Sequence, residues 1–175
     1  PACARFTGAS LRAANLRSAV LEDADFGGGA DFSRARLDGG SFRRSDFSNA
    51  DLHAASLDAG DFRDARFDAA RFDSLRAHCV EDPSSTEETP VFVCSHFDRA
   101  SFQSAALTGA DLKGAVLHGV DFAGAEFASD GCPASRPVDL RAASLARADR
   151  SAAVHSEAGC LLADSSTTYS YRTQF

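Results

Sequence analysis

The sequence predicts an all-β solenoid in which the chain turns a corner every five residues. Over most of the 175 residues, one bulky apolar residue, leucine or phenylalanine, recurs at this interval. A small residue stands two positions before nearly every one of these central residues. A period of five matches neither the ~3.6 residues of a helix nor the ~2.0 of a strand. A chain that bends once per unit explains it, because one large and one small side chain then face a narrow interior.

The central residues form an almost uninterrupted series. The series shifts by one residue through Gly27, Gly28 and Gly29, and it is interrupted again at about 78–95 and 128–138. The glycine insertion is expected to be a bulge that keeps the register of the coils. The central residues are Phe6, Leu11, Leu16, Leu21, Phe26, Phe32, Leu37, Phe42, Phe47, Leu52, Leu57, Phe62, Phe67, Phe72, Phe97, Phe102, Leu107, Leu112, Leu117, Phe122, Phe127, Leu140 and Leu145.

Columns of stacked residues follow if four units complete one coil. One column would then contain only phenylalanine, and another would contain only aliphatic residues, with Ala77 taking one central place. The phenylalanine column is Phe6, Phe26, Phe47, Phe67, Phe102 and Phe122. The aliphatic column is Leu16, Leu37, Leu57, Ala77, Leu112 and Leu140. About six coils would stack in this way, and at ~4.8 Å per layer the rod would be roughly 25–30 Å long.

The repeated motif, A-(D/N)-(L/F)-x-x, resembles the pentapeptide repeat family. It occurs, for example, as Ala50-Asp51-Leu52 and Ala110-Asp111-Leu112, and the resemblance covers about residues 4–147 apart from the two interruptions. The resemblance implies a right-handed parallel β-helix with a square, quadrilateral cross-section. We therefore expect this β-helix over residues 1–150, with projecting loops at about 78–95 and 128–138. Residues 151–175 are expected to form a non-repeat C-terminal cap.

The cysteines lie outside the inward positions of the coils and are candidates for disulfides. Cys79 and Cys94 flank the first loop, and a bond between them would contribute ~3 kcal/mol in the chain-entropy description. Cys132, in the second loop, and Cys160, in the tail, form a second candidate pair, which leaves Cys3 unpaired. Disulfides would indicate an oxidising compartment, whereas five free thiols would fit a reducing cytosol.

A zinc site is a further alternative at the first loop. His78 and His96 lie next to or near Cys79 and Cys94, so two histidines and two cysteines could converge. Their spacing differs from that of ordinary zinc fingers, and the sequence therefore favours the disulfide without a metal or another cofactor.

The first loop is also the most acidic segment of the chain. The net charge of the whole chain is −7, and residues 78–94 hold four acidic residues and no basic one, whereas residues 1–77 hold 12 acidic and 11 basic residues. The loop also contains an apolar run that would pack either on the rod or on a partner. Because loops on rigid scaffolds often carry binding residues, the candidate partner-contact residues are Glu81, Asp82, Glu87, Glu88, Val91, Phe92 and Val93.

Several classes of function are disfavoured by what the sequence lacks. There is no basic stripe for phosphate neutralisation, so nucleic acid is not an expected partner. No apolar run reaches the ~18 residues of a transmembrane segment, although a place at the periphery of a membrane complex is compatible with this. The sequence contains no glycine-rich phosphate loop, no Ser-His-Asp pattern and no HExxH motif, so we expect no enzyme.

The favoured function is a non-enzymatic scaffold that binds proteins as a subunit or accessory factor of a larger assembly. The resemblance and the cysteines place it outside the reducing cytosol, in an extracytoplasmic space or an organelle lumen such as the thylakoid lumen. The same resemblance also implies a cytoplasmic alternative, a DNA mimic of the quinolone-resistance type that binds DNA gyrase or topoisomerase. Such a mimic should carry acidic residues along its rod, and the nearly balanced charge of residues 1–77 therefore favours the scaffold.

Overall fold

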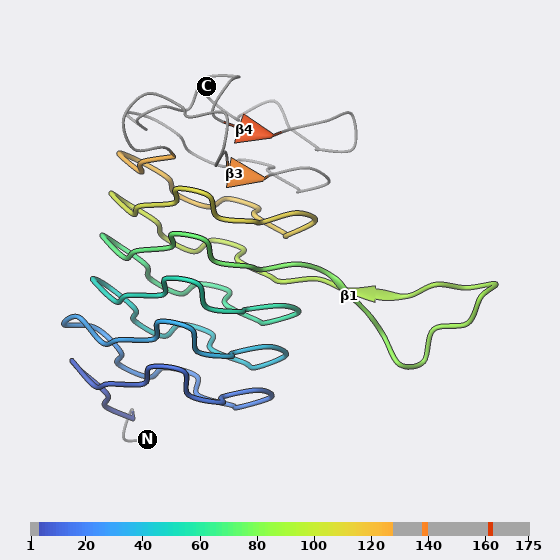
Figure 1. The fold of residues 1–175 in the computed structure, drawn as a ribbon, viewed down its shortest axis with the longest axis horizontal. Coiled ribbons are helices and arrows are strands. Elements are labelled where there is room, and N and C mark those ends of the chain that lie inside the picture. The colour runs from blue at the N-terminus through green and yellow to red at the C-terminus, as the bar shows by residue number, and fades with distance from the viewer. Residues whose placement is uncertain (1–3, 128–137, 140–160, 163–175) are drawn as a thin grey trace.

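The computed structural model describes residues 4–127, 138–139 and 161–162. Figure 1 shows residues 4–127 as a stack of flat coils that rises from the N-terminal end. Single parallel bridges join each coil to the next, as Arg5 pairs with Asp25 and Asp25 pairs with Asp46. Where no loop intervenes, the partners are 20 or 21 residues apart, so four units make a coil, and the extra residue belongs to the coil that contains the three glycines. Across the first loop the partners are 35 residues apart, as for Asp61 and His96, so the loop adds 15 residues without changing the register.

The five-residue period results from a tight turn at every corner. At the first corner the N–H of Ala9 donates to the carbonyl of Phe6 at 2.9 Å, and Gly8 between them has a φ of 65°. A positive φ at this position is typical of type II turns. Non-glycine residues occupy many equivalent corners, among them Ala13 with a φ of 55° and Arg44 with a φ of 58°. The left-handed conformation costs each of them ~1 kcal/mol, which the packing of the coils must offset.

The phenylalanine column forms the centre of the core. Phe47 stacks on Phe26 and Phe67 with ring centroids 4.8 Å and 5.0 Å apart. Phe67 stacks on Phe102 at 4.9 Å, although the first loop separates these two residues in sequence. Consecutive ring contacts join all six residues expected in the column, Phe6, Phe26, Phe47, Phe67, Phe102 and Phe122.

Small residues complete the interior between the large ones. Ala30, Ala50, Ala70 and Ala110, each two positions before a central residue, are fully buried. At Gly60 an added Cβ would lie 2.4 Å from a ring carbon of Phe62, so the interior has no room for a side chain there. The narrow rod thus requires the alternation of large and small residues that is visible in the sequence.

The regular strands within the described residues are short. β1 (Val80–Glu81) pairs antiparallel with β2 (Phe92–Val93), and Figure 1 shows β1 on a segment that projects far from the stack. β3 (Val138–Asp139) pairs in parallel with β4 (Leu161–Leu162). β3 begins at the end of the expected second loop, and β4 lies within the segment expected to be a cap.

Parts of the predicted organisation lie outside the described residues. They are the expected loop up to residue 137, the central residues Leu140 and Leu145, most of the tail at 151–175, and Cys3, Cys132 and Cys160. Among the residues that the structure describes, no helix is long and apolar enough to cross a membrane.

Candidate functional site

The projecting segment leaves the rod at Cys79 and returns at Cys94, and a disulfide joins these two residues. Their Cα atoms are 3.7 Å apart, about the ~3.8 Å between consecutive residues of a chain. The two ends of the segment are therefore no farther apart than two consecutive residues of the coil, so the insertion leaves the path of the coil unchanged. Asp61 and His96, which stand on either side of it in sequence, still pair as neighbours in successive coils.

The base of the segment packs tightly against the coils on both sides. The hydroxyl of the buried Ser95 lies 2.9 Å from the carbonyl oxygen of Leu57 and 3.0 Å from that of His78, and these two oxygens share its single hydrogen. The sulfur of Cys79 lies 3.2 Å from the carbonyl oxygen of Gly114, and a Cβ on that glycine would lie 2.8 Å from the sulfur. These contacts fix the direction in which the segment leaves the rod.

Beyond the disulfide, the segment is a hairpin held by its own hydrogen bonds. Ser85 bridges its two arms, because its Oγ accepts from the N–H of Val91 at 2.6 Å and donates to the carbonyl of the same residue at 2.9 Å. Near the tip, the main chains of Thr86 and Thr89 bond to each other, and their hydroxyls are 2.7 Å apart. We call residues 78–95 the hairpin from here on.

One acidic side chain of the hairpin is itself part of this network. The hydroxyl and the main-chain N–H of Ser84 donate to Asp82 at 2.5 Å and 2.7 Å. These two hydrogen bonds, the hydroxyl first, hold the pKa of Asp82 below its ordinary value. The carboxylate therefore keeps its negative charge in mildly acidic solution.

The structure brings all seven predicted partner-contact residues together on the hairpin. The apolar run does not pack on the rod, because Val91, Phe92 and Val93 are 46%, 60% and 38% exposed. Val80 lies opposite Val93, and it is 39% exposed. Residues directly opposite each other in an antiparallel pair point to the same side. The valines at 80, 91 and 93 therefore share one face of the hairpin, whereas Phe92 and Glu81 share the other.

The edges of the hairpin are poorly suited to the addition of another strand. Pro83 follows β1 and Pro90 precedes β2, and neither can donate a main-chain hydrogen bond. With two residues in each strand, few main-chain groups remain for a partner. Recognition at this site would therefore depend on side chains.

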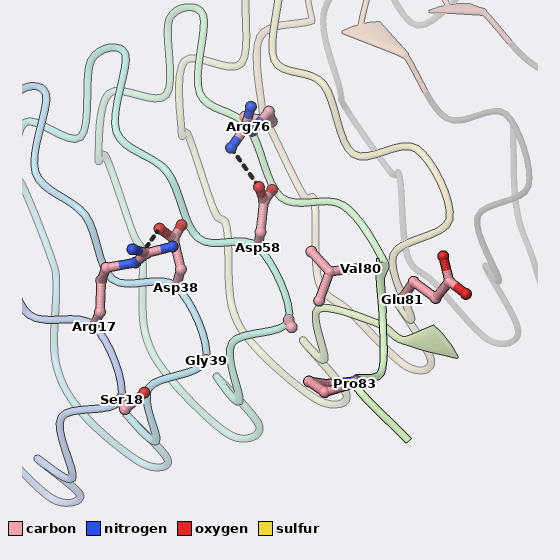
Figure 2. Close-up of a pocket in the computed structure, with 10 residues that line it drawn as sticks. Arg17, Ser18, Asp38, Gly39, Asp58, Arg76, Val80, Glu81 and Pro83 are labelled. Atoms are coloured by element: carbon pink, nitrogen blue, oxygen red, sulfur yellow. Dashed lines mark ion pairs between the residues drawn. The ribbon is translucent and has the colours of Figure 1, made fainter. Parts of the chain in front are cut away.

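A groove lies at the base of the hairpin, along one corner of the rod. Its volume is about 460 Å³. Figure 2 shows Val80 and Pro83 on its hairpin side and the ion pairs Arg17–Asp38 and Arg76–Asp58 on its rod side. The lining residues are Arg17, Ser18, Asp38, Gly39, Asp58, Ala59, Arg76, Val80, Glu81 and Pro83. The sequence reasoning missed this groove, and its only sequence signal is the small size of the corner residues.

The next corner of the rod is covered by ion pairs instead. Arg44 pairs with Asp23 at 2.7 Å, and Arg99 pairs with Asp64 at 2.6 Å. The hydrogen bond from each guanidinium is the main reason that the pKa values of Asp23 and Asp64 lie below the ordinary carboxyl value. Long charged side chains close this corner, whereas the groove corner has small residues.

These ion pairs predict a loss of stability in acid. The ordinary carboxyl pKa is 3.8, and the folded-state values of Asp23 and Asp64 lie below it, so their contribution is present above pH 3.8 and is lost as the pH falls further. The urea midpoint of unfolding should therefore be lower at pH 3 than at pH 7. The double variant Asp23→Asn, Asp64→Asn should show a smaller drop, and an identical drop would contradict the assignment.

A zinc site at the base of the hairpin is excluded, because the sulfurs of Cys79 and Cys94 are bonded to each other. Among the described residues, no three histidine, cysteine, aspartate or glutamate side chains are grouped so that they could hold a metal ion.

Sequence comparisons identify the repeat. Profiles described as "Pentapeptide repeats" match residues 4–46 with nine copies, and residues 30–68 and 95–128 with eight copies. The chain belongs to the pentapeptide repeat family. Among curated proteins, no sequence matches this member of the family.

Solved structures of other pentapeptide repeat proteins share the fold. HetL, involved in heterocyst differentiation regulation in the cyanobacterium Nostoc sp. strain PCC 7120, is 27% identical with a TM-score of 0.52. The match covers 85% of this chain but only 62% of HetL. A protein from the Arabidopsis thaliana thylakoid lumen is 20% identical with a TM-score of 0.54, over 66% of this chain and 69% of that protein.

A third similar structure is QnrB1, a plasmid-mediated fluoroquinolone resistance protein. It is 16% identical over 95% of this chain and 86% of QnrB1, with a TM-score of 0.34. The family and the pentapeptide-repeat β-helix that the sequence predicts are thus confirmed.

Proposed function

We propose that this pentapeptide repeat protein is a non-enzymatic scaffold that binds a protein partner through the hairpin at residues 78–95. The observation that carries the proposal is the exposure of Val91, Phe92 and Val93 on a hairpin that is closed by a disulfide and by its own hydrogen bonds. Exposed apolar groups on a rigid support are typical of interaction sites. The rod would act as the support that fixes the position and direction of the hairpin within a larger assembly.

The disulfide also supports a location for this scaffold. A bond between Cys79 and Cys94 persists in oxidising compartments and is rare in the cytosol of mesophiles. We therefore propose an extracytoplasmic or lumenal location, of which the thylakoid lumen is one example. The intact mass of the native protein should increase by two hydrogens per disulfide on reduction, and a protein isolated with only free thiols would contradict this location.

A variant without the hairpin tests the scaffold proposal. Deletion of residues 80–94 together with Cys79→Gly joins His78, one glycine and Ser95, which restores an unbroken five-residue period between Ala77 and Phe97. The stability of this variant should remain within ~1 kcal/mol of the native protein, because no coil residue is removed and no loop needs closing.

The variant without the hairpin should also no longer bind the partner protein. Immobilised native protein and immobilised variant would be compared for proteins retained from extracts of the source organism, with identification by mass spectrometry. A protein retained by the native chain but not by the folded variant is the expected result. Equal retention by both would show that the hairpin is not the contact site.

The alternative function, a DNA mimic that binds gyrase, is less compatible with the charge on the surface of the rod. Acidic side chains on the coils are paired with arginine, as in Arg44–Asp23, Arg99–Asp64 and Arg63–Asp61. A mimic needs uncompensated negative charge at spacings that resemble phosphates. Inhibition of gyrase supercoiling by the native protein at micromolar concentration would reverse this preference.

A further inference from the structure

The groove follows one corner of the rod through three successive coils and ends under the hairpin. Ser18, Gly39 and Ala59 occupy equivalent corner positions, and main-chain hydrogen bonds from each N–H to the next coil hold them in line. Val80 and Pro83 of the hairpin complete the groove at one end. The groove is therefore formed jointly by the rod and by the hairpin, and it depends on the direction in which the hairpin leaves the rod.

Both carboxylates on the rod side of the groove are already paired with arginines. Asp38 pairs with Arg17 at 3.2 Å and with Arg36 at 3.5 Å, and its side chain is 12% exposed. Asp58, 10% exposed, pairs with Arg76 at 2.5 Å and also accepts the N–H of His78 at 2.9 Å. A charged ligand would have to compete with these existing partners, which makes the interior of the groove poorly suited to an ion.

Four of the other residues that line the groove are apolar. Val80 and Pro83 face it from the hairpin, and Gly39 and Ala59 face it from the rod. Val80 is 39% exposed although it is paired with Val93 in the hairpin, so its methyl groups are available to a ligand. An aliphatic side chain could bury its surface against these residues without displacing an ion pair.

The hairpin side of the groove is acidic. Glu81 lines it, and Figure 2 shows its side chain extending away from the Arg76–Asp58 pair. Asp82, Glu87 and Glu88 lie on the same hairpin, which carries no arginine or lysine. Charge complementarity at an interface favours a partner with the opposite sign around its apolar contact.

We propose that the groove receives one aliphatic side chain of a partner polypeptide whose flanking residues are lysines or arginines. The aliphatic side chain packs against Val80, Pro83 and Ala59, while the basic neighbours face Glu81 and the other acidic residues of the hairpin. This inference rests on the proposed function and specifies the kind of partner that the hairpin selects.

A peptide titration tests the proposal with the full-length, oxidised protein. The probe is the amide of Lys-Lys-Leu-Lys-Lys, with Lys-Lys-Gly-Lys-Lys and Glu-Glu-Leu-Glu-Glu amides as controls, and amide chemical shifts are followed by NMR at millimolar peptide. The leucine peptide should shift the amides of Gly39, Ala59 and Val80 in a saturable way. The glycine and glutamate peptides should bind more weakly than the leucine peptide. Added salt should weaken the binding of the leucine peptide, because it screens the attraction between its lysines and the acidic side chains.

Two valines provide a matched pair of variants. Val80→Ser removes methyl groups from the groove and should weaken binding of the leucine peptide by about tenfold. Val20→Ser changes a valine of the rod that is 75% exposed and does not line the groove, and it should leave binding unchanged. Thermal unfolding of both variants identifies any loss that is due to misfolding rather than to the groove.

Other outcomes would overturn the inference while leaving the proposed function intact. Each of three results would exclude the groove as the binding site. They are chemical-shift changes confined to the tip at Glu87 and Glu88, equal binding of the leucine and glycine peptides, and equal affinity of the two valine variants. Absence of binding at millimolar peptide would exclude it as well. The proposed function fails separately, if the variant without the hairpin retains the same proteins as the native chain.

Discussion

Replacement of Phe47 by alanine should lower the free energy of unfolding by about 3–5 kcal/mol. Phe47 is fully buried, and its ring lies between those of the coils above and below, at 4.8 Å from Phe26 and 5.0 Å from Phe67. The ring centroids of Phe32, Phe42 and Phe62 also lie within 6.2 Å of the ring centroid of Phe47. A narrow interior surrounded by a hydrogen-bonded backbone cannot collapse around the missing ring, so the variant keeps a large cavity.

The adjacent residue provides the control for this substitution. Ser48→Ala should change stability by less than ~0.5 kcal/mol, because Ser48 is not part of the stacked column and its buried hydroxyl makes no hydrogen bond within the described part of the chain that the substitution would remove. Urea unfolding followed by far-UV circular dichroism would measure both variants. Equal effects of Phe47→Ala and Ser48→Ala would refute the inward stacking of the phenylalanine column.

Loss of the disulfide should have the second largest effect on stability. In the double variant Cys79→Ser, Cys94→Ser, folding must close a loop that the native protein already has closed when unfolded. With a sequence separation of 15 residues between the cysteines, the free energy of unfolding should fall by ~3 kcal/mol in the chain-entropy description. Urea unfolding of the native protein in the presence of a reductant should give a similar loss.

The variant without the hairpin distinguishes this explanation from a loss of native contacts. Both the disulfide and the deletion remove the entropic cost of loop closure, so the deleted variant should be close in stability to the oxidised native protein and above the serine variant. If the serine variant were instead as stable as the native protein, the disulfide would not stabilise the rod through the unfolded state.

The coil could be predicted from the sequence because each of its constraints is local. Phe62 must be large and Gly60 must be small because the interior is narrow, and this requirement recurs in every unit. The register across the hairpin was also predictable, because Phe97 continues the column of Phe62, whose ring it contacts at 5.3 Å. The alternation of large and small residues therefore contains most of the information about the fold.

The candidate site could be predicted only in part. The acidic and apolar composition of the hairpin indicated an exposed contact segment, and a pair of cysteines indicated its closure. The groove could not be foreseen, because Val80 approaches Gly39 and Ala59 only through the direction of the chain at Cys79. The Ser85 bridge and the pairing of outward arginine and aspartate side chains depend on rotamers, which a repeat pattern does not determine.

The Cα atoms of Cys79 and Cys94 are so close that the geometry of the coils does not restrict the hairpin to this one corner of the rod. A segment that begins and ends within one residue step could be moved to another corner of the rod, provided that the next coil offers a glycine beside the sulfur, as Gly114 does here. Moving it by one unit would rotate its azimuth by a quarter turn, and moving it by four units would raise it by ~4.8 Å at constant azimuth. The position of a contact site along the rod axis and its angle around that axis can therefore be varied independently.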